Sequence, residues 1–300
     1  MSASILSKIK RGVPNLPPRQ LVSGQVGIGK TSYGAKFPNP LFLAPESGLT
    51  GLPEHIGHLS PEKYEDVRDL VDQLTIDPSG YQSLIIDTSD ALDRSIYDYI
   101  VRREGSSKVK TIEDVGGGWQ KGYYAAAAEL SLILNKLDRL RESQQMHIVI
   151  LSHVEIKTFT SPESQVWDRY QLKGHKFMSS LWSEWPDACL FATYEIHQIK
   201  EGRKEKTVEG DRVVHTQWSP AWEAKNRLGL PETISFDYDE IEKAIFENSS
   251  PELRKNFMSL LSTSTLTEDQ RKLWTKVPVE NLPSDRIKSG IAKLEKLQSK

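Results

Sequence analysis

The feature that most constrains this chain is the segment G-Q-V-G-I-G-K-T at residues 24–31. It has the form G-x-x-x-x-G-K-T and follows the apolar pair Leu21-Val22, which predicts a strand, a glycine-rich turn and a helix start. In such a P-loop, backbone N–H groups surround phosphate oxygens, the lysine neutralises their charge and the threonine hydroxyl binds Mg²⁺. The predicted phosphate-binding residues are Gly24, Gln25, Val26, Gly27, Ile28, Gly29, Lys30, Thr31 and Ser32.

A second block, Leu84-Ile85-Ile86-Asp87, is an apolar run that ends in a carboxylate. It has the form of a Walker B strand, which places its aspartate on the metal ion. We therefore predict that Thr31 and Asp87 hold Mg²⁺ and that the chain binds ATP. Hydrolysis needs further groups, which orient the attacking water and neutralise charge on the γ-phosphoryl group.

Three other segments offer such groups. Glu46 follows the apolar run 41–44, so we expect it at the carboxyl edge of a sheet, where it would polarise water. His153 ends another apolar run and would sense the γ-phosphate. Lys225 and Arg227 are separated by one residue and would project together toward a neighbour's nucleotide. The alternatives are an ordinary loop carboxylate, a structural histidine and a solvated basic turn.

Apolar and amphipathic segments alternate along the chain. Four apolar runs predict strands, at residues 21–22, 41–44, 84–87 and 147–151. The helical segments between them are residues 30–36, 61–76, 91–103 and 123–141. This alternation predicts an α/β fold with a mostly parallel sheet. Later segments predict a terminal β-hairpin (188–199 and 212–218, with a turn at 201–210) and a helical C-terminal extension from residue 239.

Composition argues against a disulfide-stabilised protein and against a membrane-spanning protein. The 300 residues carry a formal net charge of −2, so bulk charge neither requires nor excludes nucleic acid as a partner. The single cysteine allows no disulfide within the chain, which suits a reducing compartment. No run of apolar residues is long enough to cross a bilayer. We therefore expect a cytoplasmic protein with no membrane partner.

Taken together, these segments resemble the RecA-like core ATPases, and most closely the short phage-encoded ATP-binding or single-strand annealing proteins. The resemblance covers roughly residues 20–236 and rests on residues 24–31, 41–48, 81–88, 117–124, 147–153 and 225–231. It implies a RecA-like P-loop NTPase at 20–236. Outside this range, the residues themselves predict a flexible basic segment at 1–19 and a helical extension at 237–300. The resemblance also implies a phage protein in a bacterial host cell.

The same resemblance implies ATP held between the subunits of a ring or filament. Glu46 would be the base, Lys30 and His153 would act on the same phosphates, and Lys225 and Arg227 would act in trans. The enzyme would be an ATPase, with a rate that depends on single-stranded DNA, and would promote annealing or homologous recombination. A single-strand-binding protein is a further candidate partner. The alternatives are a helicase-like motor or loader and a nucleotide-switch interaction protein.

DNA-binding loops are implied after the third and fourth strands, at residues 104–118 and 154–180. Both carry cations, and the second interleaves them with aromatic rings, which suits phosphates and stacked bases. The candidate DNA-binding residues are Lys108, Lys110, Lys157, Trp167, Arg169, Tyr170, Lys173 and Lys176. The alternative for 154–180 is a structured insertion whose rings belong to a core.

Overall fold

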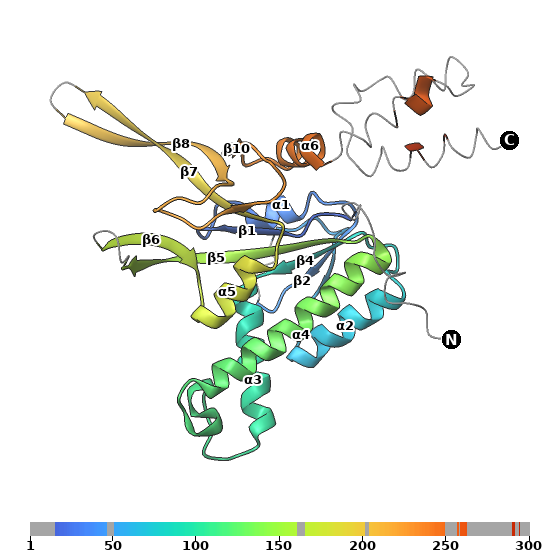
Figure 1. Cartoon of the computed structure of the whole chain (residues 1–300), viewed down its shortest axis with the longest axis vertical. Helices are drawn as coiled ribbons and strands as arrows, with labels where there is room; N and C mark the ends of the chain where they lie inside the picture. Colours follow the sequence, from blue (N-terminus) through green and yellow to red (C-terminus); the bar gives the residue numbers. More distant parts are fainter. Residues whose placement is uncertain are drawn as a thin grey trace, which may run out of the picture.

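The computed structural model describes residues 16–46, 51–160, 166–201 and 204–249, and also residues 257, 259–262, 290, 291 and 294. They form one mixed sheet with helices on both faces (Figure 1). The strands are β1 (Gln20–Gly24), β2 (Pro40–Leu43), β3 (Gly57–Leu59), β4 (Ser83–Asp87), β5 (His147–Phe159), β6 (Trp167–Leu172), β7 (Ala188–Glu201), β8 (Lys204–His215), β9 (Lys225–Asn226) and β10 (Thr233–Ser235). The helices are α1 (Lys30–Gly34), α2 (Tyr64–Ile76), α3 (Ser89–Glu104), α4 (Lys121–Gln144), α5 (Lys176–Glu184) and α6 (Tyr238–Ser249), with the 3-10 helix η2 (Ile112–Gly117).

The strand order is β10-β8-β7-β1-β5-β4-β2-β3, with β6 on β5 and β9 on β7. The central strands β7, β1, β5, β4 and β2 pair in parallel, which confirms the predicted mostly parallel sheet. Parallel strands end at a common edge of the sheet. In this register Gly24 lies opposite His153, and Asp87 lies opposite Leu151. The predicted nucleotide-binding segments therefore meet at the carboxyl edge of β1, β4 and β5.

Two apolar layers hold the helices to the sheet. One face packs against α2, α3, α4 and α5, and the other packs against α1, α6 and the segment around β10 (Figure 1). In α2 the predicted apolar face is confirmed, because Tyr64, Val67, Val71 and Leu74 are all buried. Strand β4 is buried along its whole length, as its unbroken apolar run requires in a sheet covered on both faces.

The terminal hairpin is confirmed, but its turn is not where the sequence predicted it. Strands β7 and β8 stay paired as far as Glu201 and Lys204, so residues 204–210 belong to a strand. The two strands form a long arm that extends past the sheet (Figure 1).

Two predicted loops prove to be ordered. Strand β5 does not end at His153; it continues to Phe159 and pairs antiparallel with β6, and α5 follows. The described residues of the expected loop at 154–180 thus form two paired strands and a helix. Within 104–118, η2 buries Ile112 and Val115 in the core.

The start of the predicted C-terminal extension is helical, as α6. Most of the rest of that extension, and residues 1–15 of the predicted basic segment, lie outside the described residues. None of the helices in the described residues combines the length and apolar character needed to span a membrane.

Candidate nucleotide-binding site

The loop between β1 and α1 takes its shape from its glycines. Gly29, the N-cap of α1, has φ 107°, a left-handed conformation that favours glycine. Gly24 is constrained by space, because a Cβ there would lie 2.6 Å from the Ala192 carbonyl oxygen of β7. The spacing of glycines that predicted a phosphate-binding loop therefore has a structural cause at both ends.

Lys30 is buried at the base of this loop. Its Nζ donates hydrogen bonds to the carbonyl oxygens of Gly24 and Gln25, both at 2.9 Å. Burial lowers the pKa of the Lys30 amine to about 8, and the nearby carboxylates oppose this shift only in part. The structure thus holds a desolvated cation against the loop, where added phosphate charge would stabilise its protonated form.

Thr31 and Asp87 lie together, as the metal prediction requires. The Thr31 hydroxyl donates to Asp87 Oδ2 at 2.8 Å. Burial raises the pKa of Asp87, although the hydrogen bond from Thr31 and the charge of Lys30 oppose this. One hydroxyl and one carboxylate are a donor set that suits Mg²⁺, which takes its other ligands from phosphates and water. The residues present therefore fit MgATP.

A cavity of about 800 Å³ opens at this edge of the sheet, within the size range of small-molecule sites. It is lined by P-loop residues, by the predicted catalytic residues Glu46 and His153, and by Asp87. The P-loop residues that line it are Val26, Gly27, Gly29, Lys30, Thr31 and Ser32; the predicted Gly24, Gln25 and Ile28 are not among its lining residues. On the side of α1 the lining is Ala35, Lys36, Gly51, Leu52 and Pro53.

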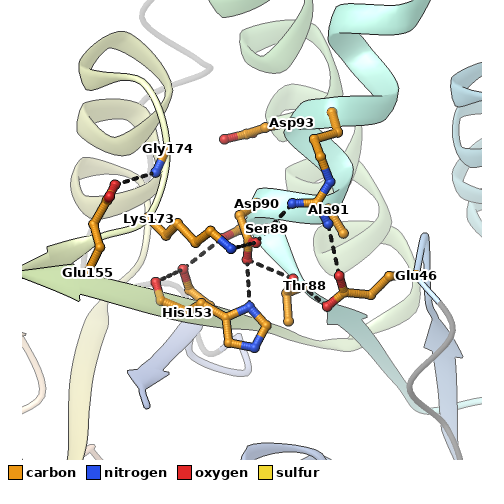
Figure 2. A network of polar contacts seen from close by, with 12 residues as sticks. Glu46, Thr88, Ser89, Asp90, Ala91, Asp93, His153, Glu155, Lys173 and Gly174 are labelled. Atoms are coloured by element: carbon orange, nitrogen blue, oxygen red, sulfur yellow. Dashed lines mark hydrogen bonds and ion pairs between the residues drawn. The ribbon is translucent and has the colours of Figure 1, made fainter. Parts of the chain in front are cut away.

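Asp90, at the start of α3, is the centre of a polar network beside the cavity (Figure 2). It is buried and accepts hydrogen bonds from Thr88 Oγ1 (2.8 Å) and Arg94 Nη1 (3.2 Å), and its Oδ1 lies 3.1 Å from His153 Nδ1. Lys173 Nζ lies 3.7 Å away. Burial acts to raise the pKa of Asp90, but the hydrogen bonds from His153 and Thr88 and nearby positive charge outweigh it, so the pKa lies well below its usual value. Asp90 is therefore a fixed anion.

Glu46 joins the same network from the loop after β2 (Figure 2). Arg94 Nη2 donates to Glu46 Oε2 at 2.8 Å, and Thr88 Oγ1 lies 3.3 Å from Glu46 Oε1. Because a hydroxyl carries one proton, Thr88 bonds mainly to the closer Asp90, and Arg94 is the principal partner of Glu46. The predicted base thus lines the cavity while a guanidinium holds it.

Lys225 and Arg227 lie at the opposite edge of the sheet. β9 pairs with the start of β7, where Asn226 lies opposite Ala188, at the level where β1 begins. Lys225 Nζ donates hydrogen bonds to the Ser183 carbonyl at 3.2 Å and to the Glu184 carbonyl, both at the C-terminal end of α5. Arg227 is exposed. Neither cation joins the other predicted site residues within the chain.

Most candidate DNA-binding residues of the β5–β6 hairpin have partners inside the protein. Arg169 is buried, with its guanidinium over the rings of Phe159 and Trp218 at 5.1 and 5.8 Å. Trp167 Nε1 donates to the Pro220 carbonyl at 2.7 Å. The alternative of a structured insertion describes these side chains better than an open DNA-binding loop does.

Two other hairpin residues are also engaged. The Tyr170 hydroxyl accepts from Gln25 Nε2 of the P-loop at 3.1 Å, and Lys157 Nζ donates to the Gly174 carbonyl at 3.0 Å. The candidates whose side chains stay exposed are Lys108, Lys110, Lys173 and Lys176.

A family model described as an AAA domain matches residues 16–228, more than half of the chain. The chain belongs to this AAA domain family. Among solved structures, the crystal structure of the RadB recombinase is similar over 74% of this chain and 90% of that chain, with 12% identity and a TM-score of 0.40. A comparison with curated proteins found no match. The AAA domain of this chain is a P-loop ATPase with a mostly parallel sheet.

Several residues that lie at or beside the site of this AAA domain were not predicted from the sequence. Thr88, Asp90 and Arg94 follow the Walker B strand directly, and the i,i+4 spacing of Asp90 and Arg94 on a helix was a usable signal. Arg212, which contacts the P-loop from β8, had no local signal at all.

Proposed function

We propose that this protein hydrolyses MgATP in response to single-stranded DNA and acts in annealing or homologous recombination, like the short phage-encoded proteins that it resembles. The bound Mg²⁺ would neutralise charge on the phosphate oxygens. Glu46 would orient the attacking water from its position on the cavity wall, and Lys30 would bind the phosphates.

The observation that carries this proposal is the position of Lys173, which lies beside the polar network of the nucleotide site and four residues before Phe177, one of a group of aromatic rings at the surface. Its Nζ lies 3.7 Å from Asp90 Oδ2, and its backbone N–H donates to the His153 carbonyl at 3.0 Å. Half of its side chain is exposed. A DNA phosphate that attracts Lys173 would compete with Asp90 for it. Asp90 also binds Arg94, and Arg94 holds Glu46. This competition would therefore affect Glu46, the proposed base.

These rings lie where α4 and α5 begin, and we call Trp119, Tyr124 and Phe177 the ring surface. The rings of Tyr124 and Phe177 are 4.4 Å apart, and Lys176 Nζ lies 5.2 Å from the centre of the Phe177 ring. Trp119 is 91% exposed, Tyr124 is 60% exposed, and Phe177 is partly exposed. Because α4 leads directly into β5 and α5 into β7, both helices begin at the edge of the sheet that carries the P-loop. Accessible rings beside cations suit the bases and phosphates of a single strand.

Fluorescence anisotropy of a labelled oligothymidine across a salt series tests this proposal, with ATP, ADP or no nucleotide. We expect the double variant Lys173→Ala, Lys176→Ala to weaken binding and to lower the salt slope by roughly 0.7 for each DNA phosphate that the protein no longer neutralises. Phe177→Ala or Tyr124→Ala should weaken binding by about 1–3 kcal/mol, the contribution of one stacked base, with little change in slope.

The matched control is Lys243→Ala, which removes an exposed lysine from α6 on the other face of the sheet. It should leave both affinity and slope unchanged. If the wild-type protein binds no oligonucleotide in any nucleotide state, or if the ring-surface and lysine variants bind as wild type does, the DNA proposal is wrong. A nucleotide-switch interaction protein would then be the better account.

We also propose that ATP sites are shared between subunits, with Arg227 acting in trans. Its exposed side chain lies at the edge of the sheet away from its own P-loop, so it would meet a nucleotide only in a neighbouring subunit. Lys225 is a weaker candidate, because its amine caps the C-terminal end of α5.

Mixing two inactive variants tests the shared site. Arg227→Ala and Lys30→Ala would damage different halves of one composite site, so a mixture should regain up to about a quarter of wild-type turnover, because random pairing leaves that share of interfaces intact. Each variant alone is the control. No regained turnover, together with monomeric light scattering in ATP, would rule out sharing.

A further inference from the structure

Strand β8 brings an arginine to the P-loop from a distant part of the chain. Arg212 lies opposite Tyr194 of β7, two residues beyond Ala192, and Ala192 lies opposite Gly24 of β1. The pairing of β8 with β7 and of β7 with β1 therefore sets Arg212 near the end of β1, where the P-loop begins.

The guanidinium of Arg212 lies against the backbone of the loop. Its Nη1 donates a hydrogen bond to the Ile28 carbonyl oxygen at 3.3 Å. A Cβ placed on Gly29 would lie 2.7 Å from the same nitrogen. Arg212 thus contacts the loop at the two residues before Lys30, and any larger residue at position 29 would have to displace it.

The other cations of this region already have partners. Lys30 is held by loop carbonyls, and Lys36 pairs with Asp237 at 2.9 Å. Within the described part of the chain, no carboxylate forms an ion pair with Arg212, and its side chain is exposed. A guanidinium has five N–H donors, and the contact with Ile28 uses only one of its nitrogens. Arg212 therefore presents positive charge and hydrogen-bond donors beside a loop that binds phosphates.

We propose that Arg212 is a second cation of the nucleotide site, which acts in cis: by holding the loop at Ile28, it keeps the P-loop backbone in place for the phosphates, and its charge favours their binding. This inference rests on the nucleotide-binding part of the proposed function and is independent of DNA. Because Arg212 contacts the loop backbone and is not among the residues that line the cavity with Glu46 and His153, it supports binding of ATP and ADP alike. It is a positioning residue for the nucleotide, distinct from the groups that act on water.

Titration of a fluorescent ADP analogue and of ATP into the full-length protein, without DNA, tests this role. Arg212→Ala should raise the Kd for both nucleotides by about tenfold or more, the effect expected from losing one charge-assisted hydrogen bond. Turnover at saturating ATP should change less than about threefold, because the interaction stabilises ground state and transition state equally. Arg212→Lys should regain part of the affinity, since it keeps the charge but not the planar fork.

The matched control is Arg139→Ala, which removes an exposed arginine from α4 on the other face of the sheet and should leave the Kd unchanged. Circular dichroism melting reports whether each variant folds. Wild-type affinity in a folded Arg212→Ala protein overturns this inference alone, and loss of ATP but not ADP affinity overturns it too. Failure of the wild-type protein to bind any nucleotide would instead contradict the proposed function.

Discussion

Replacing Lys30 with alanine should reduce ATP turnover by at least about 10²-fold, because the P-loop lysine offsets charge on the phosphates as they react. The side chain is buried, and among the described residues its amine bonds only to the carbonyls of Gly24 and Gln25, so its removal breaks no ion pair there. A phosphate-release assay measures turnover, with Lys243→Ala as the control for loss of a lysine elsewhere. Wild-type turnover in folded Lys30→Ala protein would refute the predicted role of the P-loop.

The wild-type protein offers a second test of the same charge. The folded-state pKa of Lys30 is lowered to about 8, so the amine is charged below pH 8 and loses its proton as the pH rises through that value. Bound phosphates favour the charged amine and raise its pKa, so binding above pH 8 requires proton uptake. Affinity for ATP should then fall about tenfold per pH unit above 8. Lys30→Arg keeps its charge throughout and should lack this dependence.

Replacing Glu46 with glutamine should lower turnover by roughly 10²-fold or more while ATP binds normally. Glutamine keeps the shape of the side chain but cannot accept a proton from water. Its amide oxygen can still accept the hydrogen bond from Arg94 Nη2, so the loop after β2 should keep its position. Binding of a fluorescent nucleotide and steady-state turnover, measured on one preparation, separate the two effects.

The matched control for Glu46→Gln is Glu65→Gln. Glu65 also accepts from an arginine, Arg102, at 2.8 Å, but it lies on α2, outside the nucleotide cavity. Loss of an arginine-bound carboxylate by itself should therefore leave turnover near wild type. If Glu46→Gln hydrolyses ATP at the wild-type rate, Glu46 has no part in the reaction.

The parts of the fold that the sequence predicted well carry strong local signals. Strand β4 is an unbroken apolar run, and α2 repeats its buried residues with helical spacing. The β5–β6 hairpin was missed although residues 154–157 alternate apolar and polar side chains, a strand signal. The cations and rings of that segment also suit a nucleic-acid loop, and only its pairing with β6 shows that Arg169 turns inward.

Local sequence determined the core of the site. Gly29 and Lys30 lie within one short turn, and the left-handed conformation at Gly29 follows from the residue itself. Parallel strands then bring Glu46, Asp87 and His153 to the same edge, which the alternation of strands and helices already implied.

Only the tertiary structure decided which cations reach that site. Lys225 and Arg227 were predicted to act on a neighbour's nucleotide, and the pairing of β9 with the start of β7 places them away from the P-loop of their own chain. Arg212 meets the P-loop instead, because β8 runs antiparallel to β7 in a register set by contacts between strands. A register of this kind depends on residues far apart in the chain, so no local pattern encodes it.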